Sequence, residues 1–399
     1  MAERQLQDAY IVAATRTAVG KAPRGVFRTT RPDTLLAHVL TRALAQAEGL
    51  PPARVEDVIV GCAMPEYEQG MNIARIGVLL AGLPPSVAGM TVNRFCSSGL
   101  NAVSIAADRI RTGEADVMIA AGVESMSMIP MLGRLALNPD VFARDENVAI
   151  AYGMGLTAEN VARRWNVSRD DQDAFALESH RRALAAQAAG EFASEIAAFE
   201  VEERRPDLAA GVVDVTRRHV ARDEGPRPDA TLEALSRLKP VFAAQGSVTA
   251  GNSSQTSDGA GAVVLVSERA LRDHGLKPLA RFVGFAVAGV PPDVMGIGPV
   301  AAIPKLLATT GVRQHAIDWI ELNEAFAAQS LAVMRQLDLD PDRVNPLGGA
   351  IALGHPLGAT GAIRTATVVH GLQRRGGKYG MITMCVGTGM GAAGLIEAM

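Results

Sequence analysis

The sequence predicts an α/β fold, and two patterns support this prediction. Short apolar runs rich in β-branched residues alternate with stretches of helical spacing, as in folds where helices cover buried strands. Glycine makes up 40 of the 399 residues, and its clusters at 348–362 and 385–394 predict tight strand-to-helix turns rather than a flexible linker. The clearest candidate strands are Ala9–Ala13, Val58–Val60, Val117–Ala121, Ala262–Val266 and Met381–Met384.

A weak internal repeat divides the chain into two similar halves. The aligned segments are 55–64 with 316–325, 91–106 with 343–366 after a gap, and the strand at Val117 with the strand at Met381. Few positions are identical, but the alignment places Cys96 and His355 at equivalent helix starts. The repeat therefore predicts two reactive side chains near one interface.

Between about 125 and 255 the alternation is interrupted. A methionine-rich loop is followed by a helix-like stretch at 169–189 and by a charged tract from Glu202 to Arg227 that contains prolines. This part of the chain predicts an inserted lobe.

Composition excludes several classes of function. The 39 Lys and Arg residues against 42 Asp and Glu leave a formal net charge of −3, so no global positive charge favours nucleic acid or an anionic membrane. Three cysteines cannot form a disulfide framework and fit a reducing compartment. No apolar run reaches the ~20 residues that span a bilayer, and the first residues lack the apolar core of a secretory signal. We expect a cytoplasmic protein.

No bound metal or redox nucleotide is expected either. The chain has no CxxC or HExxH spacing, and no phosphate-binding glycine loop follows a candidate strand.

Cys96 is the first candidate for catalysis. It precedes a stretch with helical apolar spacing, and a helix N-terminus lowers the pKa of a thiol and so favours the nucleophilic thiolate. A free cysteine is more often a small buried apolar residue, so the local sequence leaves both interpretations open.

Three further residues have the chemistry of a catalytic site. Cys385 opens a glycine-rich turn whose uncovered N–H groups can bind an oxyanion, although such a turn also serves merely to join strands. His355 lies on a constrained loop before a helix, where it can accept a thiol proton, whereas the other six histidines are expected at the surface or in the core. Asn323, which follows a strand, is the third candidate. The alternative is that it serves as an ordinary helix cap.

Seven motifs, in order and spacing, resemble those of the thiolase family. The resemblance covers nearly the whole chain, and the ordered set is far more specific than any single motif. The motifs are VNRFCSSGL (92–100), GVESMSM (122–128), MGLTAENVA (154–162), SVTAGNSSQTSDGA (247–260), NEAFA (323–327), GGAIALGHPLGATGAI (348–363) and CVGTGMGAAG (385–394).

This resemblance implies the five-layered αβαβα thiolase fold, in which two similar α/β halves carry an inserted loop domain. It implies an N-terminal half at 1–124 with 256–278, a CoA-binding loop domain at 125–255 and a C-terminal half at 279–399.

The resemblance also implies roles for individual residues. Cys96 would be the nucleophile, activated by His355, and Cys385 would be a second acid/base thiol. Asn323 would hold a water beside His355 to form one oxyanion hole, and the N–H groups of Cys96 and Gly387 would form the other.

Coenzyme A would be a co-substrate, with no permanently bound cofactor. The implied CoA contacts are Ser254, Arg227, Ala250, Met154, Ala325 and Phe326, with Arg217, Arg218 and Arg222 forming either a basic rim or a solvated charged face.

The details of the motifs are most similar to degradative 3-ketoacyl-CoA thiolases (acetyl-CoA C-acyltransferases), which implies a role in fatty acid β-oxidation. Acetoacetyl-selective thiolases usually have a histidine where this chain has Gly153, and often a serine where it has Ala234. The alternative is a biosynthetic acetoacetyl-CoA thiolase (acetyl-CoA acetyltransferase) that runs the Claisen condensation.

Other relatives resemble the chain less. A decarboxylating ketosynthase needs a second catalytic histidine, and a hydroxymethylglutaryl-CoA synthase needs a glutamate near the nucleophile. A catalytically inactive CoA- or lipid-binding relative would be expected to lose a catalytic group, and none is lost here. The family implies a homodimer or homotetramer, or one subunit of a β-oxidation multienzyme complex.

Overall fold

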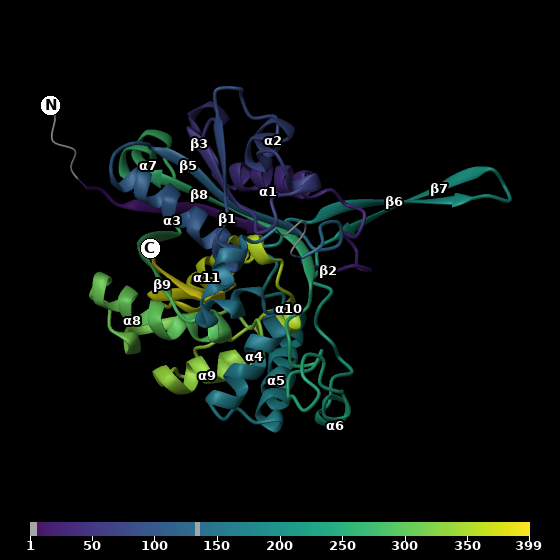
Figure 1. Cartoon of the computed structure of the whole chain (residues 1–399). Coiled ribbons are helices and arrows are strands. Elements are labelled where there is room, and N and C mark those ends of the chain that lie inside the picture. Colours follow the sequence, from purple (N-terminus) through teal and green to yellow (C-terminus); the bar gives the residue numbers. More distant parts are fainter. Residues whose placement is uncertain (1–5, 132–135) are drawn as a thin grey trace.

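The computed structural model describes residues 6–131 and 136–399, and it contains two α/β halves (Figure 1). The strands are β1 (Ala9–Arg16), β2 (Gly20–Lys21), β3 (Asp57–Gly61), β4 (Ala88–Val92), β5 (Val117–Ser125), β6 (Phe199–Asp207), β7 (Val212–Val220), β8 (Ser257–Ser267), β9 (Ala280–Gly289), β10 (Ile317–Leu322), β11 (Tyr379–Val386) and β12 (Met390–Ala398). The helices are α1 (Pro32–Gln46), α2 (Ile73–Leu80), α3 (Ser98–Arg111), α4 (Met154–Arg164), α5 (Arg169–Ala188), α6 (Leu232–Ser236), α7 (Glu268–His274), α8 (Gly298–Thr310), α9 (Ala327–Leu337), α10 (Ala350–Leu353) and α11 (Leu357–Arg375). All five candidate strands are confirmed.

The two halves have the same strand order. The first is β1-β8-β5-β3-β4 and the second is β9-β12-β11-β10, with parallel pairing of β3 to β4 and β5, and of β10 to β11. A parallel bridge between Ile320 and Val344 takes the place that β4 has in the first half. This shared topology confirms the internal repeat, and antiparallel pairing of β1 with β9 joins the two sheets.

The helices and sheets form the expected five layers. Helices α1, α2 and α7 share one apolar core with the outer face of the first sheet, and α8 and α9 share another with the second sheet. Between the sheets, α3 and α11 pack on both and on each other. A Cβ added to Gly361 of α11 would lie 2.0 Å from the backbone nitrogen of Leu100 in α3, so glycine allows these two helices to approach at backbone distance.

A long segment between β5 and β8 contains α4, α5, α6 and the β6–β7 hairpin, which extends away from the body of the molecule (Figure 1). The sequence correctly predicts α5 to within one residue at its C-terminal end. It does not predict the hairpin, because the tract is highly charged and Pro206 lies within β6. The antiparallel pairing of β6 with β7 still forms, because most side chains of the two strands are exposed to solvent. The exact bounds of the three expected domains stay a prediction.

In the part of the chain that the structure describes, no helix combines the length and apolar character needed to cross a membrane.

Candidate active site

Cys96 lies in a tight turn that leads into α3. The turn is a 3₁₀ helix over Phe95–Ser97, so Cys96 precedes α3 rather than lying in its first turn as expected. Phe95 has a φ of 43°, in the left-handed region. The Ser98 hydroxyl donates to the Phe95 carbonyl (2.7 Å) and accepts from the Arg94 N–H (2.8 Å), and these bonds hold the turn in place.

His355 is fixed from several sides. It follows Gly354, whose φ is 91° and where a Cβ would lie 2.4 Å from the Ser257 hydroxyl oxygen. The His355 backbone N–H donates to the Gln255 carbonyl (3.2 Å) and to Ser257 Oγ (3.1 Å). Its ring Nδ1 lies 2.7 Å from Thr360 Oγ1. The constrained loop and the following helix, α11, are as expected.

Asn323 completes a buried pair with this histidine. Its Nδ2 lies 3.3 Å from His355 Nε2, and the two residues are 3% and 4% exposed. Asn323 directly follows β10, but α9 begins only at Ala327, so the side chain does not cap a helix. Its Oδ1 has no hydrogen-bond partner within the part of the chain that the structure describes.

Cys385 lies near the end of β11 and is fully buried. Gly387 follows in the turn to β12, and its backbone N–H acts to lower the pKa of the Cys96 thiol, which places this N–H near the sulfur. The Cys96 and Cys385 thiols are close enough to interact electrostatically, which contributes to the raised pKa of Cys385. Three of the predicted residues, from two separate segments, therefore lie close together here: Cys96 from one, and Cys385 and Gly387 from the other.

The thiols and the imidazole are neutral in this environment. Loss of contact with water is the largest effect on Cys96 and raises its pKa to about 11, although N–H groups of Gly387 and Cys96 oppose it. Burial also raises the pKa of Cys385 well above its usual range. Burial, and then the charge of Arg364, lower the pKa of His355 to about 3. Backbone N–H groups at the turn before α3 do lower the pKa of Cys96 as expected, but desolvation outweighs them, so the net shift is upward.

Two apolar clusters flank the cysteine pair. The cluster at Cys96 also contains Ala63, Met64, Phe95, Met126, Met128, Ile129 and Leu357. The cluster at Cys385 contains Met154, Ala158, Val248, Met295, Ala325 and Phe326. Three of the predicted CoA contacts, Met154, Ala325 and Phe326, thus pack beside Cys385.

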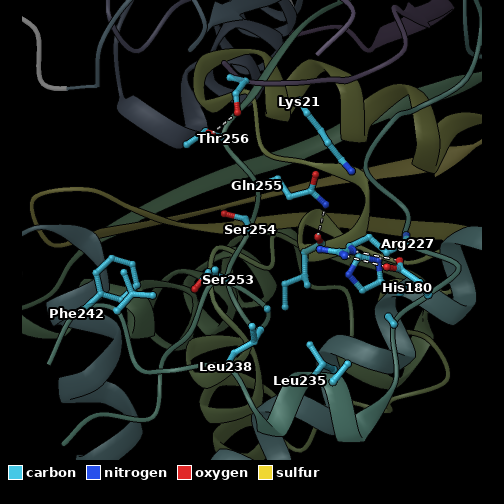
Figure 2. A pocket seen from close by; sticks show the side chains of 18 residues that line it. Lys21, His180, Arg227, Leu235, Leu238, Phe242, Ser253, Ser254, Gln255 and Thr256 are labelled. Carbon is cyan, nitrogen blue, oxygen red and sulfur yellow. Dashed lines mark hydrogen bonds and ion pairs between the residues drawn. The ribbon is translucent and has the colours of Figure 1, made fainter. Parts of the chain in front are cut away.

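A cavity of about 560 Å³ lies close to this site (Figure 2). Of the predicted CoA contacts, Arg227, Ala250 and Ser254 line it. Phe326 does not line the cavity itself, but its ring packs edge-on against the cavity residue Phe242, with ring centroids 6.1 Å apart. Arg217, Arg218 and Arg222 do not line the cavity. Arg217 pairs instead with Glu202 in the hairpin, and Arg222 with Gln187.

Sequence reasoning missed several cavity residues. His180 was expected at the surface or in the core, and Lys21 was not considered, yet both line the cavity. The apolar residues Leu235, Leu238 and Phe242 were also missed. No local signal identifies these positions, because their segments meet only in the folded chain.

One extended segment connects the cavity to the catalytic candidates. The Ser254 N–H donates to the Ala325 carbonyl (2.9 Å), and Ser253 forms a bridge with Phe326. Two residues after Ser254, Thr256 forms a parallel bridge with His355. A molecule in the cavity would therefore contact the same segment that holds the Asn323 loop and His355.

Metal binding has no structural support among residues 6–131 and 136–399, where no group of three or more His, Cys, Asp or Glu side chains is arranged to hold an ion.

Comparison with known proteins identifies the family. Residues 9–269 match the model of the thiolase N-terminal domain, and residues 276–398 match that of the thiolase C-terminal domain. The chain is 48% identical to a 3-ketoacyl-CoA thiolase of Bacillus subtilis, over 98% of this chain and 100% of that protein. It is 47% identical to the peroxisomal 3-ketoacyl-CoA thiolase 2 of Arabidopsis thaliana, over 98% and 84% of the two chains. The crystal structure of the Bacillus anthracis acetyl-CoA acetyltransferase superposes with a TM-score of 0.89 at 40% identity, covering 100% of both chains. These matches span both halves and the inserted segment, and the chain belongs to the thiolase family.

Proposed function

We propose that this protein is a degradative 3-ketoacyl-CoA thiolase (acetyl-CoA C-acyltransferase). It would cleave 3-ketoacyl-CoA with free CoA into acetyl-CoA and an acyl-CoA shortened by two carbons, in fatty acid β-oxidation. Three contacts support the proposal. Cys96 lies near Cys385. Asn323, which pairs with His355, donates its backbone N–H to the carbonyl of Thr383, two residues before Cys385. Thr256, which lines the cavity, forms a bridge with His355. Identity of 45–48% to several 3-ketoacyl-CoA thiolases supports the substrate class.

The first half-reaction forms an acyl-enzyme. The Cys96 thiol transfers its proton to the neutral His355 as the sulfur attacks the 3-keto carbon. The bond between C2 and C3 then breaks, the acyl group stays on Cys96, and acetyl-CoA leaves as an enolate that takes a proton at C2 from Cys385. The high pKa of Cys385 suits a group that starts each cycle protonated.

The second half-reaction releases the product. The Cys385 thiolate removes the proton of the CoA thiol, and the CoA sulfur attacks the acyl group on Cys96. As the tetrahedral intermediate collapses, Cys96 leaves and recovers its proton from His355. Both thiols return to their starting state, and the mechanism predicts ping-pong kinetics.

Two oxyanion holes support these steps. The N–H groups of Gly387 and Cys96 both act to lower the pKa of the Cys96 thiol, so they are suited to stabilise the oxyanion that forms beside it. The unpartnered Asn323 Oδ1 can accept a hydrogen bond from a water, which would donate with His355 to the enolate oxygen.

CoA occupies the cavity in this proposal. Ser254 and Ala250 line the path of pantetheine, Arg227 meets the nucleotide end, and Met154, Ala325 and Phe326 shape the approach to Cys385. CoA is a co-substrate, and the proposal includes no permanently bound cofactor. We also propose a cytoplasmic homodimer or homotetramer, or a subunit of a β-oxidation complex; light scattering would report its mass.

The alternative is a biosynthetic acetoacetyl-CoA thiolase. The similarity to the Bacillus anthracis acetyl-CoA acetyltransferase favours it. The glycine at 153, where acetoacetyl-selective thiolases usually have a histidine, favours the degradative function.

Initial rates of CoA-dependent cleavage of 3-ketoacyl-CoA substrates with four to sixteen carbons separate the two functions. The loss of enolate absorbance follows the reaction. We expect a higher kcat/KM for the longer chains. Activity on acetoacetyl-CoA alone would support the biosynthetic alternative, and no activity on any chain would support a binding protein.

A further inference from the structure

One end of the cavity gathers charged and polar groups from segments far apart in the sequence (Figure 2). Arg227 and Asp229 form an ion pair with 3.0 Å between Nη2 and Oδ2. His180 accepts a hydrogen bond at Nδ1 from the Arg227 backbone N–H (3.2 Å). Burial, and then the charges of Arg227 and Lys21, lower the pKa of His180 to about 4, so it is neutral at pH 7. The charges of Arg227 and Asp229 therefore already neutralise each other.

Lys21 is the remaining cation at this end. Its amine is directed toward the Arg227 and His180 side chains (Figure 2). It acts electrostatically on both His180 and Asp229, which places its charge close to both. Within the described ranges 6–131 and 136–399, the structure gives this amine no hydrogen-bond or ion-pair partner. A partly buried ammonium without a partner is suited to bind an anion.

The backbone of Lys21 is held against the loop that presents Arg227. The Glu224 carboxylate accepts from the N–H groups of Lys21 and Val26, each at 2.9 Å through Oε2. On the other side, Lys21 pairs with Ser257 at the start of β8, close to the segment that lines the cavity. The position of Lys21 is therefore determined by two neighbours of the cavity.

We propose that Lys21 binds a phosphate group of coenzyme A at this end of the cavity. CoA carries a 3′-phosphate and a diphosphate, and either would neutralise an ammonium that forms no ion pair with the residues that the structure describes. Lys21 comes from the N-terminal half, so the inserted segment does not bind CoA alone. The inference rests on the proposed function, because it takes CoA as the occupant of the cavity.

The test compares three acceptor thiols in the cleavage reaction: CoA, 3′-dephospho-CoA and pantetheine, which has no phosphate. We expect Lys21→Met to raise the KM for CoA about tenfold to a hundredfold while kcat changes by less than about twofold. With pantetheine, the variant and the wild type should have equal kinetic constants. Lys21→Arg should recover most of the loss. Lys277→Met, an exposed lysine outside the cavity, is the matched control.

Each outcome decides a point. If the effect disappears with 3′-dephospho-CoA, Lys21 binds the 3′-phosphate, and if it persists, Lys21 binds the diphosphate. An unchanged KM for CoA, or an equal loss with pantetheine, would overturn the inference. If the wild type cleaves no 3-ketoacyl-CoA, the proposed function fails, and calorimetric titration of CoA into the wild type and Lys21→Met still decides the role of Lys21.

Discussion

At the scale of single residues, the Cys96 thiol and the His355 imidazole are both uncharged. A pKa of about 11 for Cys96 and about 3 for His355 means that neither is charged at pH 7. The site therefore holds no preformed thiolate–imidazolium pair, and in the proposed mechanism the proton moves during attack on the substrate. Preorganised N–H groups beside the sulfur then stabilise the charge that develops on the bound oxygen.

Serine variants separate the roles of the two active-site cysteines. Cys96→Ser should abolish acyl-enzyme formation, because a hydroxyl is a far weaker nucleophile than a thiol. Cys385→Ser should still be acylated by an activated acyl donor but should lose cleavage and formation of the carbon–carbon bond by at least about a hundredfold. Peptide mass spectrometry locates the acyl group, and an adduct on a peptide without Cys96 would disprove the assignment.

The pKa of Cys96 can be tested by alkylation. Iodoacetamide reacts with the thiolate, so the rate at Cys96 should keep rising above pH 9 instead of levelling off near the usual ~8.5. At pH 8 we expect alkylation about two orders of magnitude slower than for an exposed cysteine of ordinary pKa. The Cys385→Ala variant restricts the readout to the site at Cys96, since Cys62 is fully buried. A rate that is constant from pH 6 to 8 would instead indicate a preformed ion pair.

At the scale of elements, contact between α3 and α11 aligns the segments that carry Cys96 and His355. Cys96 precedes α3 by two residues, and His355 precedes α11 by two. Glu124, at the end of β5, adds a second connection: its buried carboxylate accepts from the N–H groups of Ala63 (2.7 Å) and Gly358 (2.9 Å). The relative position of Cys96 and His355 thus depends on packing between the two halves.

Replacement of Gly361 with alanine tests this packing. The new Cβ would lie 2.0 Å from the Leu100 nitrogen, and backbone cannot move aside as a flexible side chain can. We expect a loss of about 1–3 kcal/mol in the free energy of unfolding, measured by urea denaturation, together with slower acylation of Cys96. Gly289→Ala is the control, because a Cβ there meets nothing within 4 Å. Equal stability of the two variants would contradict the expected clash.

At the scale of the whole molecule, a buried ionic network connects both halves with the inserted segment. Arg16, 2% exposed, contacts Glu195 Oε1 at 2.6 Å and Asp223 Oδ1 at 2.7 Å, and both acids belong to the insertion. Glu195 also accepts from the Thr367 hydroxyl of α11 (2.9 Å). One side chain at the end of β1 thus links three regions that are distant in the sequence.

The variant Arg16→Met should destabilise the protein strongly. It would leave two buried carboxylates without their cation, which costs about 3–5 kcal/mol in the free energy of unfolding. Urea denaturation measures this loss. Arg272→Met provides the comparison, since its pair with Glu268 is exposed and should contribute less than about 1 kcal/mol. Similar effects of the two changes would show that the network does not stabilise the fold.

Many local features were predictable from the sequence. The five strands, α5 and the repeat follow from periodicity over short windows, and the motifs locate Cys96, His355, Asn323 and Cys385. The β6–β7 hairpin was not predictable, because its charged residues hide the alternation typical of a strand. The positions of Lys21 and His180 at the cavity could not be predicted from the sequence either, since Lys21 lies more than 200 residues from Arg227.

By itself, the sequence determined the family, the layered α/β class and the candidate catalytic side chains, because each depends on residue type and short-range spacing. Only the tertiary structure decided their charge states, the cavity near them and the position of the Lys21 amine at one end of that cavity. Desolvation and electrostatic pairing depend on which distant segments surround a group, and short-range spacing carries no information about those neighbours.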